Sequence, residues 1–314
     1  MKKTEMLNAV ESILKKAGFK VSERCISRMS CFDFMAKKEN QLTLIKIPKN
    51  ICCISAKDAS ELHEISAYLP ATPLLISNKM REKLLENDTV YTRYDIYAIT
   101  LKTLKDIVFH GMHPLVEAGP GGYYVNLDGE KIRERRQSLG LSIGKLSEML
   151  GISRRTLYGY ERGIVKASVS VAYNLEWILG VPVVKPINVF ERRKNRETSF
   201  FSTARRVFRR NRFLRLVLEK LAHLNLSIIS TERAPFDFIA FYRKEKLKII
   251  GGITTREESS IDRRTKEIMS ISNLAEAKPI LITDGIKVPN NDIPSFHHEE
   301  LEKIKHVNDL VSSI

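Results

Sequence analysis

An internal repeat constrains the fold of this chain more than any other feature of its sequence. The motif F-D-F stands at residues 32–34 and 236–238, and it is followed at nearly equal spacing by P-L-L-I at 73–76 and P-I-L-I at 279–282. Matching motifs at matching spacing indicate a duplicated structural unit. We therefore predict two copies of one small α/β domain, at residues 1–112 and 212–314.

The apolar runs within each copy are typical of buried strands. FDFMA, LTLIKI and PLLIS in the first copy, and FDFIA, LKIIGGI and PILIT in the second, are short and rich in β-branched or aromatic residues. Helix-like stretches separate these runs. Each copy is therefore expected to be a small sheet covered by helices.

The segment between the copies has a different pattern. Residues 113–128 are punctuated by proline and glycine, which predicts a loop leading into a strand or hairpin. Residues 129–185 have the periodicity of four short helices. Residues 186–211 form a basic linker interleaved with Phe200 and Phe208, and it is either a solvated hinge or an arm that contacts phosphates. The predicted fold class is α/β plus all-α, with two repeated small α/β domains flanking a central helical domain.

Two capped helices with a glycine turn between them are predicted inside residues 129–185. Ser142 and Ser153 are placed to cap the two helices. Gly151 supplies the left-handed residue that a tight helix-turn-helix needs. The side chains expected to face inward are those of Leu146, Met149, Leu150, Leu157 and Tyr160. Positions 154, 155, 158, 159 and 162 are expected to face outward.

The outward face of the second helix begins with two arginines. Cations are unfavourable in the first turn of a helix, where the dipole is positive. A guanidinium matches the O6 and N7 acceptors of guanine, and the N-terminal part of such a helix is the part that enters the major groove. We therefore predict that Arg154, Arg155 and Tyr158 read DNA bases.

The stretch GEKIRERRQSLGLSIGKLSEMLGISRRTLYGYERG resembles the Cro/repressor-type (XRE-like) helix-turn-helix of phage repressors. The resemblance implies a structural ion pair between Arg136 and Glu161. It also places Ser142 near the DNA backbone and Thr156 at the start of the reading helix. Phosphate contacts are then expected from Ser142, Lys145, Thr156 and Arg162. With the lead-in AGPGGYYVNLDGEKIRERR, the whole chain resembles archaeal HTH-type transcriptional regulators.

This sequence departs from the repressor pattern at two places. Gly159 stands where relatives often present a base-reading side chain, and its lack of a side chain suggests a close backbone approach. The fifth helix, often a dimer contact in that family, is replaced by VPVVKPINV. Dimerisation is therefore expected from the duplicated flanks.

The flanks also resemble a restriction-endonuclease-type strand pair. That fold uses an aspartate and then an acid-x-lysine on the next strand to hold Mg²⁺ and activate water. Asp33 and Lys46 are present, but Leu44 replaces the acid; in the second copy Asp237 persists without the lysine. We interpret Asp33, Lys46 and Asp237 as degenerate nuclease-like remnants that hold no metal. Another small α/β fold and an active nuclease are the alternatives.

Several other motifs are expected to be structural. Cys25, Cys31, Cys52 and Cys53 form no C-x-x-C pair and are interpreted as buried thiols, the adjacent two inside a packed strand, with a metal or redox role as the alternative. Trp177 is expected in the core. The run HHEE at 297–300 is interpreted as exposed rather than metal-binding. The AGPGG stretch lacks the lysine of a P-loop, so no cofactor is expected.

Charge and hydropathy define the class of partner. The chain carries 52 basic and 37 acidic residues, a net charge of +15, which attracts polyanions such as nucleic acid or anionic lipid. No apolar run approaches the roughly 20 residues of a membrane span, and the charged N-terminal helix is unlike a secretory signal. We expect a cytoplasmic protein with no membrane partner.

The sequence thus predicts a sequence-specific transcriptional regulator that binds double-stranded DNA as a homodimer and is not an enzyme. One alternative is a nucleic-acid-processing, nuclease-like protein or a structure-specific nucleic-acid binder. A third hypothesis is an adaptor that binds RNA or a partner protein.

Overall fold

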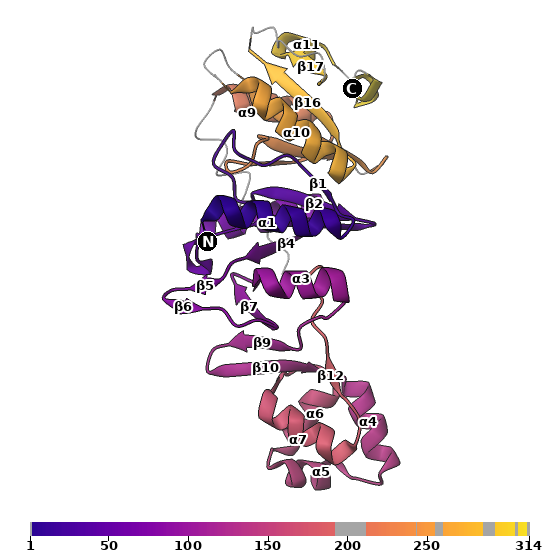
Figure 1. The fold of residues 1–314 in the computed structure, drawn as a ribbon. Helices are drawn as coiled ribbons and strands as arrows, with labels where there is room; N and C mark the ends of the chain where they lie inside the picture. Colours follow the sequence, from indigo (N-terminus) through magenta and orange to yellow (C-terminus); the bar gives the residue numbers. More distant parts are fainter. Residues whose placement is uncertain are drawn as a thin grey trace. The chain divides into compact units, whose positions relative to one another are not determined.

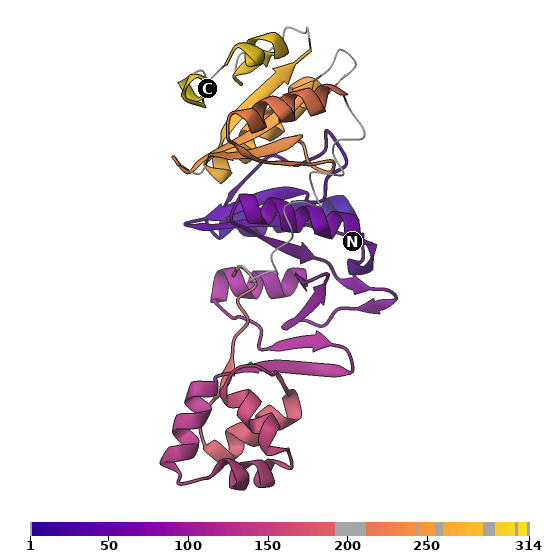
Figure 2. The same ribbon diagram turned by 180° about the vertical axis from the view of Figure 1, so that it is seen from behind.

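The computed structural model describes residues 2–191, 212–242, 244–254, 260–284, 293–304 and 307–312. Residues 192–211 of the predicted basic linker lie outside the described part, whereas residues 186–191 are described and bury Ile187, Val189 and Phe190. The chain divides into two compact units (Figures 1 and 2), each described by itself. The terminal unit is drawn from Met1–Ile47, Ile54–Leu74 and Phe190–Ile314, and the central unit from Pro48–Cys53 and Leu75–Val189.

The first half of the terminal unit is a small sheet with helices. Its elements are α1 (Lys3–Lys16), β1 (Lys20–Val21), β2 (Phe34–Lys38), β3 (Gln41–Lys46), α2 (Ala56–Tyr68) and β4 (Ala71–Ile76), whose last two residues are assigned to the central unit. The strand order is β1-β2-β3-β4, with β1, β2 and β3 antiparallel. Helix α1 buries Met6, Val10 and Leu14, an i, i+4, i+8 stripe.

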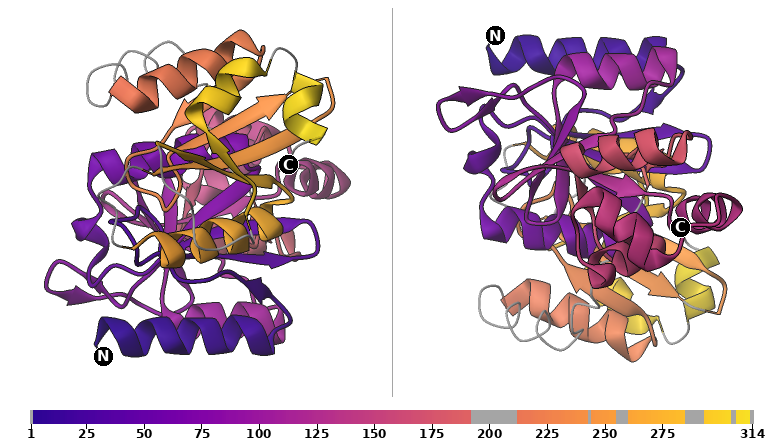
Figure 3. Two further views of the ribbon diagram at one scale, coloured as in Figure 1. Left: turned by 90° about the horizontal axis from the view of Figure 1, so that it is seen from above. Right: turned by 90° about the horizontal axis from the view of Figure 1, so that it is seen from below.

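The second half of the terminal unit repeats this order of elements. It contains α9 (Arg212–His223), β13 (Ser227–Ser230), β14 (Phe238–Tyr242), β15 (Leu247–Thr254), α10 (Ile261–Ala275) and β16 (Lys278–Thr283), then β17 (Ser295–His297), α11 (His298–Lys303) and α12 (Val307–Ser312). The strand order is β13-β14-β15-β16-β17, and β16 runs parallel to β15. Helices α9 and α10 cover opposite faces of this sheet (Figure 3, left).

The central unit joins strands to a helical domain. Its strands are β5 (Lys79–Met80), β6 (Lys83–Leu84), β7 (Thr89–Arg93), β8 (Ile96–Ile99), β9 (Val116–Gly119), β10 (Gly122–Leu127), β11 (Ala167–Ser168) and β12 (Val184–Lys185). The strand order is β8-β7-β9-β10-β11, β9 and β10 form a hairpin, and β12 also pairs with β10. The remaining elements are the 3₁₀ helix η1 (Ile51–Cys53) and the helices α3 (Leu101–His110), α4 (Gly129–Ser138), α5 (Ile143–Leu150), α6 (Arg154–Glu161) and α7 (Val169–Leu179).

The helices α4 to α7 enclose one apolar core, which includes Ile132, Leu146, Leu157 and Leu175. Two side chains expected in this core are exposed instead. Trp177 is 79% exposed and Met149 is 49% exposed. Helix α7 faces inward through Ala172, Leu175 and Leu179, and Trp177, two residues from Leu175, therefore lies on the opposite face. In the short helix α5, Leu146 and Leu150 already form the inward i, i+4 pair.

The four cysteines were predicted to be buried, and this is confirmed for two of them and wrong for the adjacent pair. Cys25 and Cys31 are buried, and burial raises the pKa of both thiols. Cys53 is exposed and Cys52 is half-buried. Residues 51–53 form the 3₁₀ helix η1 rather than a packed strand. In the described part of the chain, no helix is long and apolar enough to span a membrane.

Candidate nucleic-acid interface

Local capping chemistry builds the turn between α5 and α6. The Ser142 hydroxyl accepts a hydrogen bond from the backbone N–H of Lys145 at 3.0 Å, and the Ser153 hydroxyl accepts one from Thr156, also at 3.0 Å. Gly151 ends α5 in the left-handed conformation, at φ +65°. These three residues close a tight helix-turn-helix.

Arg136 and Glu161 form a buried bidentate ion pair between α4 and the end of α6. The Arg136 Nε lies 2.5 Å from Oε1 of Glu161, and its second nitrogen lies 3.1 Å from Oε2. Arg136 also donates to the Leu141 carbonyl at 2.9 Å. The hydrogen bond to Glu161 raises the pKa of Arg136. The pair fixes the orientation of α6 against α4.

The predicted base-reading side chains lie on the exposed face of α6. Arg154, Arg155 and Tyr158 are exposed. The Arg154 guanidinium lies against Gly144 of α5, where an added Cβ would stand 3.1 Å from its Nε. The Arg162 guanidinium lies over the Tyr158 ring, 5.0 Å from the ring centre. Lys145 is exposed, and its Nζ lies 3.2 Å from Oε2 of Glu148.

Gly159 does not face outward, and this expectation is wrong. Gly159 is buried, and an added Cβ would lie 3.0 Å from Cγ2 of Val165. The chain returns after α6 and places Val165 over this position. The close neighbour is thus the Val165 side chain rather than a backbone segment.

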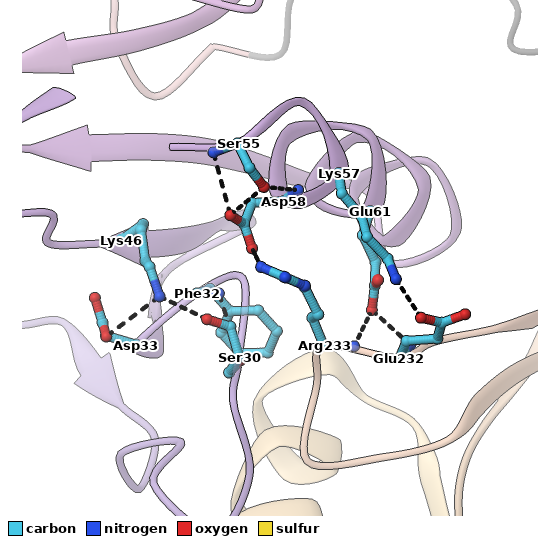
Figure 4. Close-up of polar contacts among 10 residues, drawn as sticks. All are labelled: Ser30, Phe32, Asp33, Lys46, Ser55, Lys57, Asp58, Glu61, Glu232 and Arg233. Carbon is cyan, nitrogen blue, oxygen red and sulfur yellow. Dashed lines mark hydrogen bonds and ion pairs between the residues drawn. The ribbon is translucent and has the colours of Figure 1, made fainter. Parts of the chain in front are cut away.

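The nuclease-like remnant Asp33 is held by cations. Its carboxylate lies 3.0 Å from Nζ of Lys3 and 3.6 Å from Nζ of Lys46, and it accepts the Ile47 backbone N–H at 2.6 Å. Lys46 also donates to the Ser30 carbonyl at 2.5 Å (Figure 4). The two amino groups and the backbone N–H take the acceptor positions that a metal ion would need.

Asp237 has a similar environment in the second half. It pairs with Arg28 at 2.6 Å and with Arg264, and it accepts the Ile253 backbone N–H at 2.5 Å. Arg264 is 1% exposed and also donates to the carbonyls of Pro235 and Ile253. The Asp237 carboxylate is therefore committed to ion pairing.

These residues do not fit a catalytic Mg²⁺ site. The acid position is occupied by Leu44, which is fully buried. Phe34 pairs with Ile45 and Phe238 pairs with Gly251, so the counterpart of Lys46 in the second half is Gly252, which carries no amino group. A Cβ at Gly252 would lie 2.7 Å from Cδ1 of Ile268, so a longer side chain does not fit there. Each aspartate faces two cations, whereas a hard divalent cation needs several oxygen ligands.

Contacts between the two halves of the terminal unit were not anticipated from the sequence. Glu61 of α2 accepts the backbone N–H groups of Glu232 and Arg233, at 2.9 and 2.6 Å, and Asp58 pairs with the Arg233 guanidinium at 2.6 Å (Figure 4). Burial raises the pKa of Glu61 to about 7. Although burial acts in the opposite direction, hydrogen bonds from Ser55 and Arg233 lower the pKa of Asp58.

The reverse contact is made by Glu267 of α10. Its carboxylate accepts the backbone N–H groups of Ile26 and Ser27, at 3.0 and 2.9 Å. Glu61 and Glu267 precede the P-L-L-I and P-I-L-I motifs by the same number of residues. This equal offset is the sequence signal from which the two glutamates could have been predicted as equivalent residues. The rings of Phe32 and Phe236, which belong to the two F-D-F motifs, also pack together, 6.4 Å apart.

The histidines near the C-terminus are less exposed than expected from the sequence. His297 and His298 are half-buried, at the end of β17 and the start of α11. With Glu299 they place one ligand atom each within 4.8 Å of one another. His297 Nδ1 already accepts the Glu299 backbone N–H at 3.5 Å, and Glu299 is exposed, so we assign no metal site to this group.

Comparison with known proteins supports both resemblances. Residues 3–114 match the model of the PD-(D/E)XK superfamily domain, and residues 132–185 match a helix-turn-helix model. A protein of Methanosarcina barkeri named "Putative HTH-type transcriptional regulatory protein" is 31% identical over 100% of this chain and 97% of its own length. A protein of the same name from Archaeoglobus fulgidus is 32% identical over 98% and 96%.

One solved structure is similar to a small part of the chain. The restriction-modification controller protein C.AhdI from Aeromonas hydrophila is 32% identical over 17% of this chain and 80% of that chain, with a TM-score of 0.16.

The capped α5–α6 turn, the Arg136–Glu161 pair and the two matched domains define a Cro/repressor-type helix-turn-helix protein that also carries a nuclease-superfamily domain. The chain belongs to the family of archaeal HTH-type transcriptional regulatory proteins. The predicted mixture of α/β and helical domains is confirmed at this level.

Proposed function

We propose that this protein is a transcriptional regulator that binds specific sequences of double-stranded DNA and reads the major groove with α6. The observation that carries the proposal is the exposed face of that helix. Within the described part of the chain, Arg154 and Arg155 have no acidic partner. Two unpaired guanidiniums at the positive end of a helix are unfavourable for an isolated domain. They are favourable beside guanine acceptors and phosphates.

Phosphate contacts would come from the ends of both helices. Ser142 caps the N-terminus of α5 and Lys145 lies in its first turn, where backbone N–H groups attract anions. Thr156 lies in the first turn of α6, and Arg162 follows its last residue. Contacts to phosphates set the register of α6 and add affinity that is independent of sequence. The basic segment 192–211 would add to this attraction.

The terminal unit, on this proposal, is two copies of one nuclease-like fold that have lost catalysis. Each aspartate stands where an active nuclease of this pattern would hold metal, and each is neutralised by two cations. The protein is therefore proposed not to be an enzyme, and Asp33, Lys46 and Asp237 serve stability.

A homodimer would place two copies of α6 in successive major grooves, about one helical turn apart. The surfaces expected to dimerise, those of the duplicated flanks, contact each other within one chain through Glu61 and Glu267. We propose that the exposed face of α7 mediates dimerisation instead. This face, named the α7 face below, presents Val169, Tyr173 and Trp177 at i, i+4 and i+8 and carries no charged side chain. Two copies of a chain with a net charge of +15 can meet there without bringing like charges together.

Selection of bound fragments from the source genome, followed by titration of one fragment, tests the DNA-binding proposal. Arg154→Ala is expected to cost on the order of 1–3 kcal/mol and to relax specificity at one base pair. Arg133→Ala is the matched control, because Arg133 is an exposed arginine of α4 outside the α5–α6 turn. Unchanged binding by Arg154→Ala would remove the assignment of α6 as the reading helix.

Nuclease activity is the second candidate, because residues 3–114 match a nuclease superfamily. Incubation with Mg²⁺ and duplex, branched or single-stranded DNA tests it. We expect no cleavage. Cleavage that Asp33→Asn abolishes would establish an enzyme.

A further inference from the structure

A pocket of about 710 Å³ lies within the central unit. It is formed by η1, the β5–β6 hairpin, β7 and the turn that joins β9 to β10. Figure 1 labels these strands. The pocket includes part of the AGPGG stretch, to which the DNA-binding proposal gives no role. Its volume falls in the range of pockets that hold small molecules, roughly 300–1,000 Å³.

The pocket combines an apolar wall with a cationic rim. Ile51, Met80 and Tyr91 contribute apolar surface. Arg81, Lys83 and Arg93 contribute three cations, against the single acid Glu82. Pockets with mostly apolar walls and a few convergent charges are typical of sites for small organic ligands.

Arg93 presents an unsatisfied donor at this pocket. Its guanidinium stacks on the Tyr94 ring, 4.3 Å from the ring centre, and donates to the Tyr94 hydroxyl at 3.1 Å. Its Nε is buried and has no hydrogen-bond partner among the residues that the structure describes. A buried N–H without an acceptor is unfavourable. Because Nε has no accessible surface, an oxyanion in the pocket would accept this hydrogen bond only after the Arg93 side chain changes rotamer.

Arg81 is held at the rim in an unfavourable backbone conformation. Its φ is +55°, which is uncommon for a residue with a side chain. The Asn50 side chain maintains it: Oδ1 accepts the Arg81 backbone N–H at 3.0 Å, and Nδ2 donates to the Arg81 carbonyl at 2.7 Å. Strain of this kind persists where surrounding contacts enforce it, and it is frequent at ligand sites.

We propose that this pocket binds a small organic anion. A phosphate or carboxylate group would accept hydrogen bonds from Arg93 and pair with Arg81 and Lys83. The rest of the ligand would pack against Ile51, Met80 and Tyr91. The net charge of the rim and the apolar wall together favour such a ligand over a bare inorganic ion.

A series of polar contacts connects the pocket to the reading helix. The hydroxyl of Thr92, a pocket residue, donates to Glu117 at 3.1 Å, and Glu117 also pairs with Lys166 at 2.5 Å. Lys166 follows Val165, the residue that covers Gly159 of α6. This path would allow the ligand to alter DNA affinity, a consequence that rests on the proposed DNA-binding function. The pocket itself does not rest on it.

Thermal unfolding of the full chain with three probes tests the pocket. Phenyl phosphate and benzoate carry the two oxyanions on an apolar ring, and inorganic phosphate carries no ring. We expect stabilisation by at least one aromatic anion at concentrations where inorganic phosphate gives none, and the aromatic anion that binds distinguishes a phosphate ligand from a carboxylate ligand. Arg93→Gln should weaken the apparent affinity at least tenfold. Arg81→Asn should also weaken the apparent affinity, because it removes a cation. The backbone conformation should be kept, since asparagine tolerates positive φ.

Arg133→Gln is the matched control, because Arg133 is an exposed arginine outside the pocket, and its response should equal that of the wild type. Equal responses in all variants would mean that anions associate with the basic surface in general, and the proposal would be wrong. Absence of stabilisation by either aromatic anion would also overturn it. So would weaker DNA binding by Arg93→Gln without any probe, since the cations would then contact DNA.

A titration of the selected DNA fragment with and without the bound probe tests the connection. The probe is expected to change the DNA dissociation constant of the wild type severalfold and to leave that of Lys166→Gln unchanged, while Lys166→Gln still binds the probe. Probe binding without any change in DNA affinity would refute the connection and leave the pocket standing. If the protein did not bind DNA, the probe would still stabilise it against thermal unfolding. A failure of the DNA-binding proposal is therefore distinguishable from a failure of the pocket proposal.

Discussion

Glu61 and Glu267 make reciprocal contacts across the terminal unit: each carboxylate accepts two consecutive backbone N–H groups from the other half. Both side chains are buried, at 8% and 2% exposed. Each contact satisfies backbone donors that would otherwise lack partners. Helices α2 and α10 thereby join the two halves, through glutamates at equal offsets before the P-L-L-I and P-I-L-I motifs.

The first prediction concerns the pH dependence of stability. The pKa of Glu61 is about 7 in the folded protein and 4.5 ordinarily, so the folded state binds this proton more tightly. The free energy of unfolding should therefore fall as pH rises from about 4.5 to 7, by on the order of 3 kcal/mol. Urea unfolding followed by circular dichroism at several pH values measures this.

Glu61→Gln should remove that slope, because glutamine does not titrate. Glu245→Gln, at an exposed glutamate of the same unit, should retain it. If Glu61→Gln left the slope unaltered, Glu61 would not be the titrating group.

The second prediction concerns the buried ion pair. Arg136→Ala or Glu161→Ala leaves one charge buried without its partner, which should cost about 3–5 kcal/mol. Replacing both, as Arg136→Met with Glu161→Leu, should recover much of that loss, because no unpaired charge remains. Calorimetric unfolding of the single and double variants checks this. Equal destabilisation by the double variant and the worse single variant would contradict it.

The third prediction compares two helical glycines. A Cβ at Gly129 would stand 2.3 Å from the backbone oxygen of Glu161, so Gly129→Ala must move backbone and should destabilise by more than about 2 kcal/mol. A Cβ at Gly159 would meet only the side chain of Val165, which is 47% exposed and can move. Better helix propensity should then keep Gly159→Ala within about 0.5 kcal/mol of the wild type. Similar losses for the two variants in chemical unfolding would contradict this account.

The fourth prediction concerns the proposed dimer. Trp177 is the single tryptophan and is 79% exposed on the α7 face. Its fluorescence should shift to shorter wavelength as protein concentration rises and the face becomes buried. Trp177→Ser should reduce the sedimentation-measured association at least tenfold. Tyr94→Ser is the control, since Tyr94 is an exposed aromatic residue of the same unit outside the α7 face. Concentration-independent emission would place any dimer contact elsewhere.

Local chemistry made the α5–α6 turn predictable. Ser142, Ser153 and Gly151 act through backbone geometry within three residues, so their spacing was sufficient. The Arg136–Glu161 pair was expected from the resemblance rather than from periodicity. The assignment of Asp33 and Asp237 to a nuclease-like pattern stays a prediction, and the cations that face these aspartates were not anticipated.

Longer-range features could not be read from the sequence because they join distant segments. Arg28 meets Asp237, and Glu61 meets the backbone of residues 232–233, contacts that no local pattern encodes. Trp177 was misplaced because an aromatic residue in an apolar run is usually buried, whereas the phase of α7 is set by Ala172, Leu175 and Leu179. Gly159 was misplaced because its partner Val165 lies beyond the helix.

The reciprocal fastening by Glu61 and Glu267 has a consequence for how the protein responds to its own abundance. Both halves belong to one polypeptide, so their association is unimolecular and is unaffected by dilution. Association through the α7 face is bimolecular and follows mass action. On the proposed model of DNA binding, lowering the amount of protein in the cell separates the paired reading helices while every terminal unit stays assembled. The concentration of the protein then sets the fraction of dimers, which carry two reading helices each.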